Sequence, residues 1–141
     1  MNKPLFLLSF LLLTLTAPLN AATDEEIADT AAGIAYDSRD LRQQIEDLRT
    51  SSNTRGAIRH LRNLNVLALD LMDLLDNGDY KDFQEIEDAG AEIEEEFLIV
   101  ARYFRGISRY SSARNDRELQ SRFRFLRAKV YYLQEQIAGN E

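Results

Sequence analysis

The chain of 141 residues contains no cysteine, no tryptophan, two prolines and one histidine. The absence of cysteine excludes disulfide bonds, haem held through a Cys-x-x-Cys-His motif, and a lipid on an amino-terminal cysteine. A single histidine excludes the paired Glu-x-x-His motifs of a di-iron bundle and the histidine clusters of a zinc site. We therefore expect no metal, no cofactor, and stability that comes from packing alone.

Catalytic motifs are also lacking. His60 and Met72 are the remaining candidates for axial haem ligands, but one predicted helix carries both, about 18 Å apart along its axis. A His/Met pair needs two helices that face one pocket, so we expect His60 to be a half-buried structural residue. The chain has no Gly-x-Ser-x-Gly elbow for a nucleophilic serine. The sequence predicts a protein that is not an enzyme.

The long apolar run is confined to the amino terminus. Lys3 is followed by an apolar run from Leu5 to Leu13 and then by Pro18 and small residues. This run is too short for a bilayer-spanning helix, which needs about 20 residues, and the order is typical of a secretory signal peptide. We expect a signal peptide over 1–22, a mature domain over 23–141 and a periplasmic location; a retained membrane anchor is the alternative.

The remaining chain shows helical periodicity and no strand-like alternation. Apolar residues, with Ser38 among them, recur in steps of four and three over about 24–49, 55–76, 80–105 and 116–137. These core stripes run from Ile27 through Ile34 to Leu48, from Ala57 through Leu64 to Leu75, from Phe83 through Phe97 to Phe104, and from Leu119 to Ile137. Short connections favour antiparallel neighbours, so we predict an all-α, up-down-up-down antiparallel four-helix bundle. A helical hairpin that dimerises into the same kind of bundle is the alternative. We expect Gly78 to end the second helix in a turn. The expected amino-terminal caps of the four helices are, in order, Thr23 with Glu26, Asn53 or Thr54, Asp79, and Asn115 with Glu118.

Charge is unevenly distributed. The formal net charge is −7, and loss of Lys3 with the signal peptide makes it more negative. From residue 70 to 96 there are 12 acidic residues and one basic, whereas from 102 to 129 there are nine basic and two acidic. Nucleic acids and anionic membranes are therefore unsuitable partners, and a basic protein is suitable. One interpretation pairs the third and fourth helices internally, and the other leaves an acidic surface free. The internal pairs would join Glu92, Glu94, Glu95 and Glu96 to Arg122, Arg124 and Arg127.

The fourth helix has more aromatic residues than its core stripe needs. Phe125 and Tyr132 share a ridge about 120° from the centre of that stripe, with Arg122 and Lys129 beside them. Aromatic residues next to arginine are typical of interface hot spots. Three interpretations stay open: a neighbouring segment covers the ridge, the chain forms a homodimer through its second or fourth helix, or a different protein binds there.

Small residues fall at one level of the predicted bundle, around residues 31–35 of the first helix and Gly90 of the third. Asn65 and Ala68 of the second helix lie near the same level. This layer predicts either a small internal pocket with Asn65 as its polar group, or a closer approach of the backbones. Because protein interiors pack densely, the second interpretation is favoured.

These features together predict an exported, non-catalytic protein that binds another protein in the cell envelope. The most specific form is an inhibitor or immunity protein that neutralises a basic cell-wall-degrading enzyme or toxin. The expected contact residues are Asp88, Glu92, Glu95 and Glu96 on the acidic face, and Arg122, Phe125, Lys129 and Tyr132 on the aromatic ridge. The alternatives are a small-ligand-binding or sensory bundle and an envelope stress chaperone. We expect no nucleic-acid partner and no stable membrane anchoring after cleavage of the signal peptide. A homodimer is compatible with the sequence.

Overall fold

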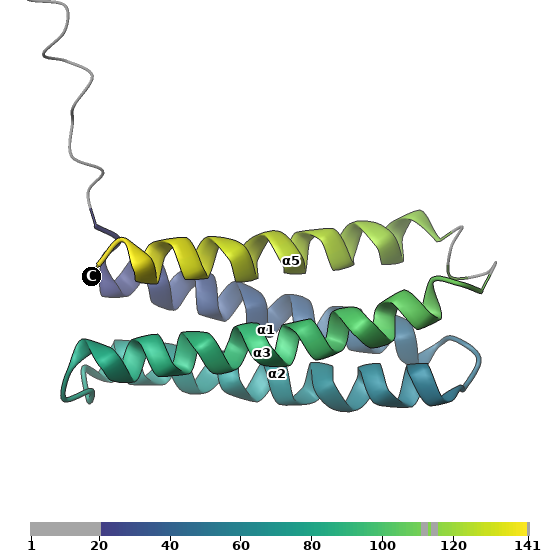
Figure 1. The fold of residues 1–141 in the computed structure, drawn as a ribbon, viewed down its shortest axis with the longest axis horizontal. Helices are drawn as coiled ribbons and strands as arrows, with labels where there is room; N and C mark the ends of the chain where they lie inside the picture. The colour runs from purple at the N-terminus through teal and green to yellow at the C-terminus, as the bar shows by residue number, and fades with distance from the viewer. Residues whose placement is uncertain (1–20, 111–112, 114–115, 141) are drawn as a thin grey trace, which may run out of the picture.

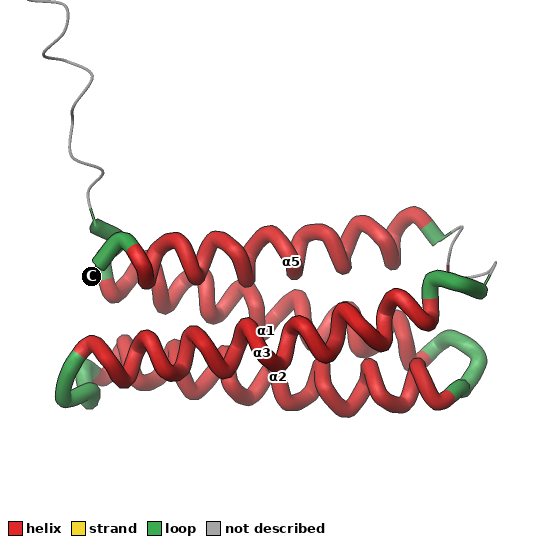
Figure 2. The backbone as a smooth tube through the Cα atoms, viewed as in Figure 1, coloured by secondary structure: helices red, strands yellow, loops and turns green. Residues whose placement is uncertain are grey.

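A computed structural model of the protein describes residues 21–110, 113 and 116–140. Over these ranges the chain contains four long helices and no strand (Figures 1 and 2). The helices are α1 Asp24–Glu46, α2 Ser52–Asn77, α3 Phe83–Ile107 and α5 Arg117–Ala138. Residues 1–20, which include most of the expected signal peptide, lie outside the described residues.

The four helices lie alongside one another as a four-helix bundle (Figure 1). Helix α1 packs against α2 and α5, and α3 packs against the same two helices, so α1 and α3 occupy opposite corners. Side chains near the end of α5 reach the start of α1: Gln136 donates to the carbonyl of Glu26 and Asn140 to that of Ala22. The α1/α5 side of the bundle is therefore opposite its α2/α3 side.

The core follows the predicted stripes. Every interior stripe position is buried, and only the terminal ones, Leu48 and Phe83, are half-buried. Burial of a Leu, Ile or Phe side chain contributes about 1.5–3 kcal/mol relative to exposure. The one polar residue expected in the α1 stripe, Ser38, is fully buried and donates to the carbonyl of Ile34 over 2.6 Å. That bond satisfies the hydroxyl within its own helix.

Two local expectations at helix ends are confirmed. Thr23 and Glu26 form a reciprocal capping box, in which the Thr23 hydroxyl accepts from the Glu26 amide and the Glu26 carboxylate accepts from the Thr23 amide. Gly78 adopts φ of 63° and ends α2. A residue with a Cβ is disfavoured in that left-handed conformation.

Three other helix starts were predicted at the wrong residue. Helix α2 begins after Ser51, rather than after Asn53 or Thr54, because Ser51 and Thr54 form a second capping box. Helix α3 begins after Asp82, three residues beyond the expected Asp79. Helix α5 begins after Asp116, whose carboxylate accepts from the amide of Leu119. The expected cap Asn115 lies outside the described residues.

Candidate functional site

The α1/α5 side of the bundle is held by ion pairs between the two helices. Lys129 Nζ lies 2.7 Å from Asp37 Oδ2, and Arg122 Nη1 lies 3.1 Å from Asp40 Oδ2. Arg122 also pairs with Glu118 one turn away, at 2.9 Å. The hydrogen bond to Glu118, with Asp40 also contributing, raises the pKa of the Arg122 guanidinium. Both predicted cations of the ridge are therefore neutralised within the chain.

The aromatic residues beside these pairs are exposed. Phe125 is 63% and Tyr132 55% exposed to solvent. A groove of about 340 Å³ runs beside Phe125, lined by Asp37, Glu118, Ser121, Arg122, Phe125 and Lys129. No described segment covers this ridge, so the first of its three sequence-based interpretations is excluded for the described residues.

Helices α3 and α5 contact each other through aromatic rings and not through charges. Phe123 stacks on Phe104 with ring centroids 4.0 Å apart, and Phe97 meets Phe123 and the edge of Tyr131. Among the described residues no ion pair joins these two helices. Of the two interpretations of the charge distribution, the one that pairs the α3 glutamates with the α5 arginines is therefore excluded among the described residues. The α5 cations Arg122 and Lys129 instead lie on the flank that faces α1.

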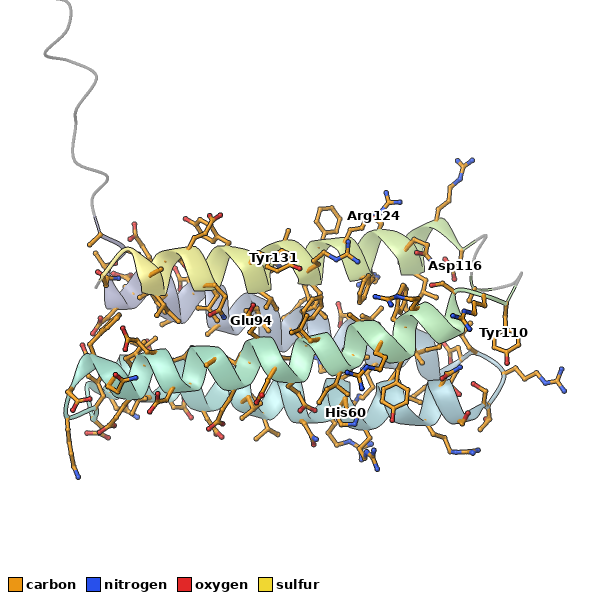
Figure 3. The ribbon with its side chains drawn as sticks, in the orientation of Figure 1. His60, Glu94, Tyr110, Asp116, Arg124 and Tyr131 are labelled. Carbon is orange, nitrogen blue, oxygen red and sulfur yellow. The ribbon has the colours of Figure 1, made fainter. Side chains whose placement is uncertain are left out.

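Helices α2 and α3 are joined by a compact polar cluster. His60 Nδ1 lies 2.6 Å from Glu96 Oε1, and both side chains are 15% exposed. The His60 ring stacks on Tyr103 at a centroid distance of 5.5 Å and an interplanar angle of 19°. Gly56 admits this Tyr103 ring, because a Cβ there would lie 2.3 Å from Tyr103 Cε1. His60, which is labelled in Figure 3, is half-buried, as expected, and Glu96 is hydrogen-bonded to it.

A shallow groove of about 260 Å³ lies next to this cluster, between α2 and α3. Its floor is apolar and its rims carry one carboxylate from each helix, Asp70 of α2 and Glu92 of α3. Both of these residues are exposed, as are Asp88 and Glu95 farther out on α3. Because Glu96 is engaged by His60 and Asp70 lines the groove, the acidic face consists of Asp70, Asp88, Glu92 and Glu95, and the name is used in this sense from here on. The floor residues are Leu67, Leu71, Leu74 and Ala89.

Most of the acidic face has no internal partner. Asp88 accepts from the Gln84 side chain on its own helix. Asp70, Glu92 and Glu95 form no ion pair or side-chain hydrogen bond with any described residue. Unpaired carboxylates that lie next to an apolar floor are available to a basic side chain of another molecule.

The eight predicted contact residues do not form one surface. Glu92 and the engaged Glu96 belong to the α2/α3 side, and Asp88 and Glu95 are exposed on α3, whereas the aromatic ridge and its two cations belong to the α1/α5 side. These sides lie across the bundle from each other (Figure 1). A compact partner therefore contacts one set or the other.

The layer of small residues is filled by neighbouring side chains. A Cβ on Gly90 would lie 2.5 Å from Cδ1 of Ile137, and Gln134 donates to the Gly90 carbonyl. The amide of Asn65 donates to the carbonyl of Ala35 over 2.6 Å. The expected polar group of a pocket is therefore used in packing α2 against α1. The small residues serve close helix approach.

Sequence reasoning missed four contributors: Asp37 and Asp40, which pair with the ridge cations, Asp70 on the groove rim, and Gly56 beneath Tyr103. Asp37 and Asp40 lie three residues apart on α1, and Arg122 and Lys129 lie seven residues apart on α5, so each pair of like charges shares one side of its helix. That spacing was the available signal. Gly56 interrupts a helical pattern without a turn residue beside it, which also indicates a packing role.

Among the described residues, no group of three or more His, Asp or Glu side chains is placed to hold a metal ion. None of the described helices is both long enough and apolar enough to cross a membrane. Comparison of the chain with protein-family models, with curated proteins and with solved structures gives no match.

Proposed function

We propose that this chain is an exported, non-catalytic protein that binds and inhibits a basic partner, such as a cell-wall-degrading enzyme or toxin. The observation that carries this proposal is the acidic face beside an apolar groove, with carboxylates that have no partner among the described residues. On the α1/α5 side, comparable aspartates are consumed by internal pairs. The contrast supports an external use for the α2/α3 carboxylates.

Binding would begin with long-range attraction. An acidic face steers a basic partner toward it and raises the association rate, more at low ionic strength than at high. At contact, a lysine or arginine of the partner lays its methylene groups on Leu67 and Leu74 and places its charged end between Asp70 and Glu92. An inhibitor of a cationic active-site cleft needs no chemistry of its own beyond this.

Export and topology belong to the same proposal. The apolar run after Lys3 supports a signal peptide over 1–22 and a periplasmic bundle over 23–141. An up-down-up-down antiparallel order is supported by contacts between opposite ends of neighbouring helices. The end of α5 bonds to the start of α1 through Gln136 and Glu26, and His60 early in α2 bonds to Glu96 in the second half of α3.

The test measures inhibition of basic cell-wall hydrolases by the purified protein, with a strongly basic lysozyme as the first enzyme. An acidic hydrolase of the same reaction class serves as the specificity control. The test variant is Asp88→Asn/Glu92→Gln/Glu95→Gln. A matched variant, Glu25→Gln/Asp29→Asn/Asp47→Asn, removes the same charge from exposed α1 positions and the residue after α1.

We expect inhibition of a basic enzyme that weakens with salt, that is lost in the α3 variant and that survives in the α1 variant. Equal loss in both variants would indicate net charge rather than this face. Absence of inhibition and of binding across a panel of basic envelope hydrolases would overturn the proposal. Mass spectrometry of the protein recovered from the cell envelope checks cleavage near Ala21 or Ala22.

A further inference from the structure

Helix α5 carries a second stripe on the side that faces away from the core. Ser121, Phe125, Ala128 and Tyr132 recur in steps of four, three and four. The last three are exposed, and Ser121 is half-buried. Phe125 and Tyr132 are seven residues apart, which is about two turns or 10 Å along the helix. This spacing is the one by which helices pack on one another.

We infer that this outer stripe is the seam of a homodimer in which α5 packs antiparallel against α5 of a second copy. With the twofold axis near Ala128, Phe125 of each copy lies against Tyr132 of the other. The small side chain of Ala128 lies at the crossing point, where it permits the two helices to approach closely.

Two unpaired charges select the antiparallel orientation. Arg124 and Glu135 form no ion pair with any described residue. They are eleven residues apart, about three turns, so they lie on the same flank of α5 but about 16 Å apart and cannot pair with each other. In an antiparallel helix pair the same flanks face each other, so Arg124 of one copy faces Glu135 of the other, twice. A parallel twofold pair would bring opposite flanks together, so Arg124 and Glu135 would not meet across it.

The aromatic and charged pairs agree on a single register. The midpoint between Phe125 and Tyr132 and the midpoint between Arg124 and Glu135 lie within one residue of each other. One antiparallel alignment therefore satisfies both kinds of contact. Figure 3 shows the labelled Arg124 directed away from the bundle, where a second helix reaches it.

The rest of the α1/α5 side does not oppose this contact. Arg122 and Lys129 are already paired with Asp40 and Asp37, so two copies bring together nearly neutral surfaces. The groove of about 340 Å³ beside Phe125 lies where the Tyr132 ring of the second copy arrives. Such a face suits a like surface better than a strongly charged partner, because Asp37, Asp40, Arg122 and Lys129 are already paired and cannot compensate the desolvated charges of that partner.

The dimer contact involves the flank of α5 next to α1, so it leaves the groove between α2 and α3 of each copy uncovered. If the proposed function holds, one dimer binds two basic partners. The dimer itself does not depend on that function, since its contacts involve none of the acidic-face residues.

The test is sedimentation equilibrium of the full chain, purified as the cell processes it, over a range of concentrations. We expect a monomer–dimer equilibrium. Arg124→Glu should weaken the dimer about tenfold or more, because two attractive pairs become repulsive at about 0.2–1 kcal/mol each. The double charge swap Arg124→Glu/Glu135→Arg should restore the wild-type equilibrium. Phe125→Asp/Tyr132→Asp should abolish dimers while helical content and unfolding temperature persist.

The matched control is Val66→Asp/Leu69→Asp, which places two charges at exposed apolar positions of α2. It should dimerise as the wild type does. A wild-type monomer at every concentration would overturn the inference, as would a dimer broken by the α2 variant and not by the α5 variants. Failure of the charge swap to restore dimers would exclude the antiparallel register. The Asp88→Asn/Glu92→Gln/Glu95→Gln variant should still dimerise, which separates this test from the inhibition assay.

Discussion

The two sides of the bundle handle charge in different ways. On the α1/α5 side, aspartates of one helix meet cations of the other, and the aromatic residues are left exposed at the rim. On the α2/α3 side, Glu96 is hydrogen-bonded to His60, and the Tyr103 ring packs on Gly56. Asp70 and Glu92 on the same side have no partner among the described residues. An acidic residue is structural where a neighbouring helix supplies a cation and available for binding where none does.

The comparison also separates two kinds of helix contact. Helices α1 and α5 approach through flexible side chains, so that a Cβ on Gly33 would lie 3.3 Å from Cδ of Lys129. Helices α2 and α3 approach through a rigid ring wedged onto a glycine. Flexible contacts adapt to a change in shape, whereas rigid ones must be displaced.

The largest expected effect comes from filling the rigid contact. Gly56→Ala should lower the free energy of unfolding by about 1–3 kcal/mol, because the new Cβ overlaps the Tyr103 ring and forces it off His60. The matched change Gly33→Ala should be neutral or stabilise by up to about 1 kcal/mol, since alanine favours helix and Lys129 can move. Urea denaturation followed by circular dichroism measures both.

If Gly56→Ala proved as harmless as Gly33→Ala, the Tyr103 ring would have to be loosely held. The variant Gly56→Ala/Tyr103→Ala is the check on the cause. Removing the ring relieves the overlap, so the two substitutions together should cost less than the sum of their separate costs.

The second effect compares one inter-helix pair from each side of the bundle, His60 with Glu96 and Lys129 with Asp37. Glu96→Ala should cost about 1–2 kcal/mol, because it removes a short hydrogen bond to a charged group between side chains that are 15% exposed. Asp37→Ala should cost about 0–1 kcal/mol, because its partner Lys129 is 41% exposed and surface pairs contribute little. Denaturation in matched buffers gives the difference, and an equal cost for both changes would contradict the ranking.

The core was predictable because helical periodicity is a property of one segment at a time. Stripe residues such as Ile34, Leu64 and Phe97 were identified from spacing alone, and all three are buried. Exposure of Phe125 and Tyr132 followed from the same arithmetic, since residues about 120° from a stripe lie outside the core. Asp88, Glu92 and Glu95 of the acidic face were predicted from the sequence, but only the structure adds Asp70 and shows which of these carboxylates have no partner.

Which helix meets which flank could not be predicted. Spacing places Arg122 on one flank of α5 but does not say whether α1 or α3 lies there, because that depends on the handedness of the bundle. The structure puts α1 beside that flank, so Asp40 became the partner instead of the α3 glutamates. Caps were missed for a local reason. Both Ser51 and Asn53 are residues that can cap a helix. Helix α2 starts after Ser51, and is longer than predicted, because the side chains of Ser51 and Thr54 each accept from the backbone amide of the other.

A third prediction concerns the end of the bundle where α1 begins and α2 ends. The hydroxyl of Tyr80 donates to Asp24 over 2.6 Å, and this hydrogen bond raises the pKa of Tyr80 above its ordinary value. A raised folded-state pKa means that the stabilisation is complete below the unfolded value of about 10 and is lost as the pH rises through the folded value. Tyr80→Phe should therefore lower the unfolding temperature at neutral pH.

The same variant should lose less stability than the wild type when the pH is raised beyond about 10, because no phenol remains to ionise at that position. Thermal unfolding in buffers on either side of that pH measures the two slopes. Parallel decline of wild type and Tyr80→Phe would contradict the assigned hydrogen bond. Tyr132→Phe is the control, since that phenol is exposed and its hydroxyl donates to no described residue.

The smallest effect on stability is expected where the largest effect on binding is proposed. Asp70→Asn/Glu92→Gln removes two unpaired carboxylates from the rims of the α2/α3 groove, and exposed positions without partners change stability by no more than about 0.5 kcal/mol. The substitution should stabilise the protein slightly at low salt, because it reduces repulsion within the acidic stretch, and this gain should vanish as salt screens the repulsion.

Removing the paired carboxylates instead, in Asp37→Asn/Asp40→Asn, should destabilise the protein, because Lys129 and Arg122 lose their partners. Denaturation of both variants at low and high salt measures these opposite signs. A destabilised Asp70→Asn/Glu92→Gln protein would mean that these carboxylates also hold the fold, and that the contrast between the two sides of the bundle is wrong.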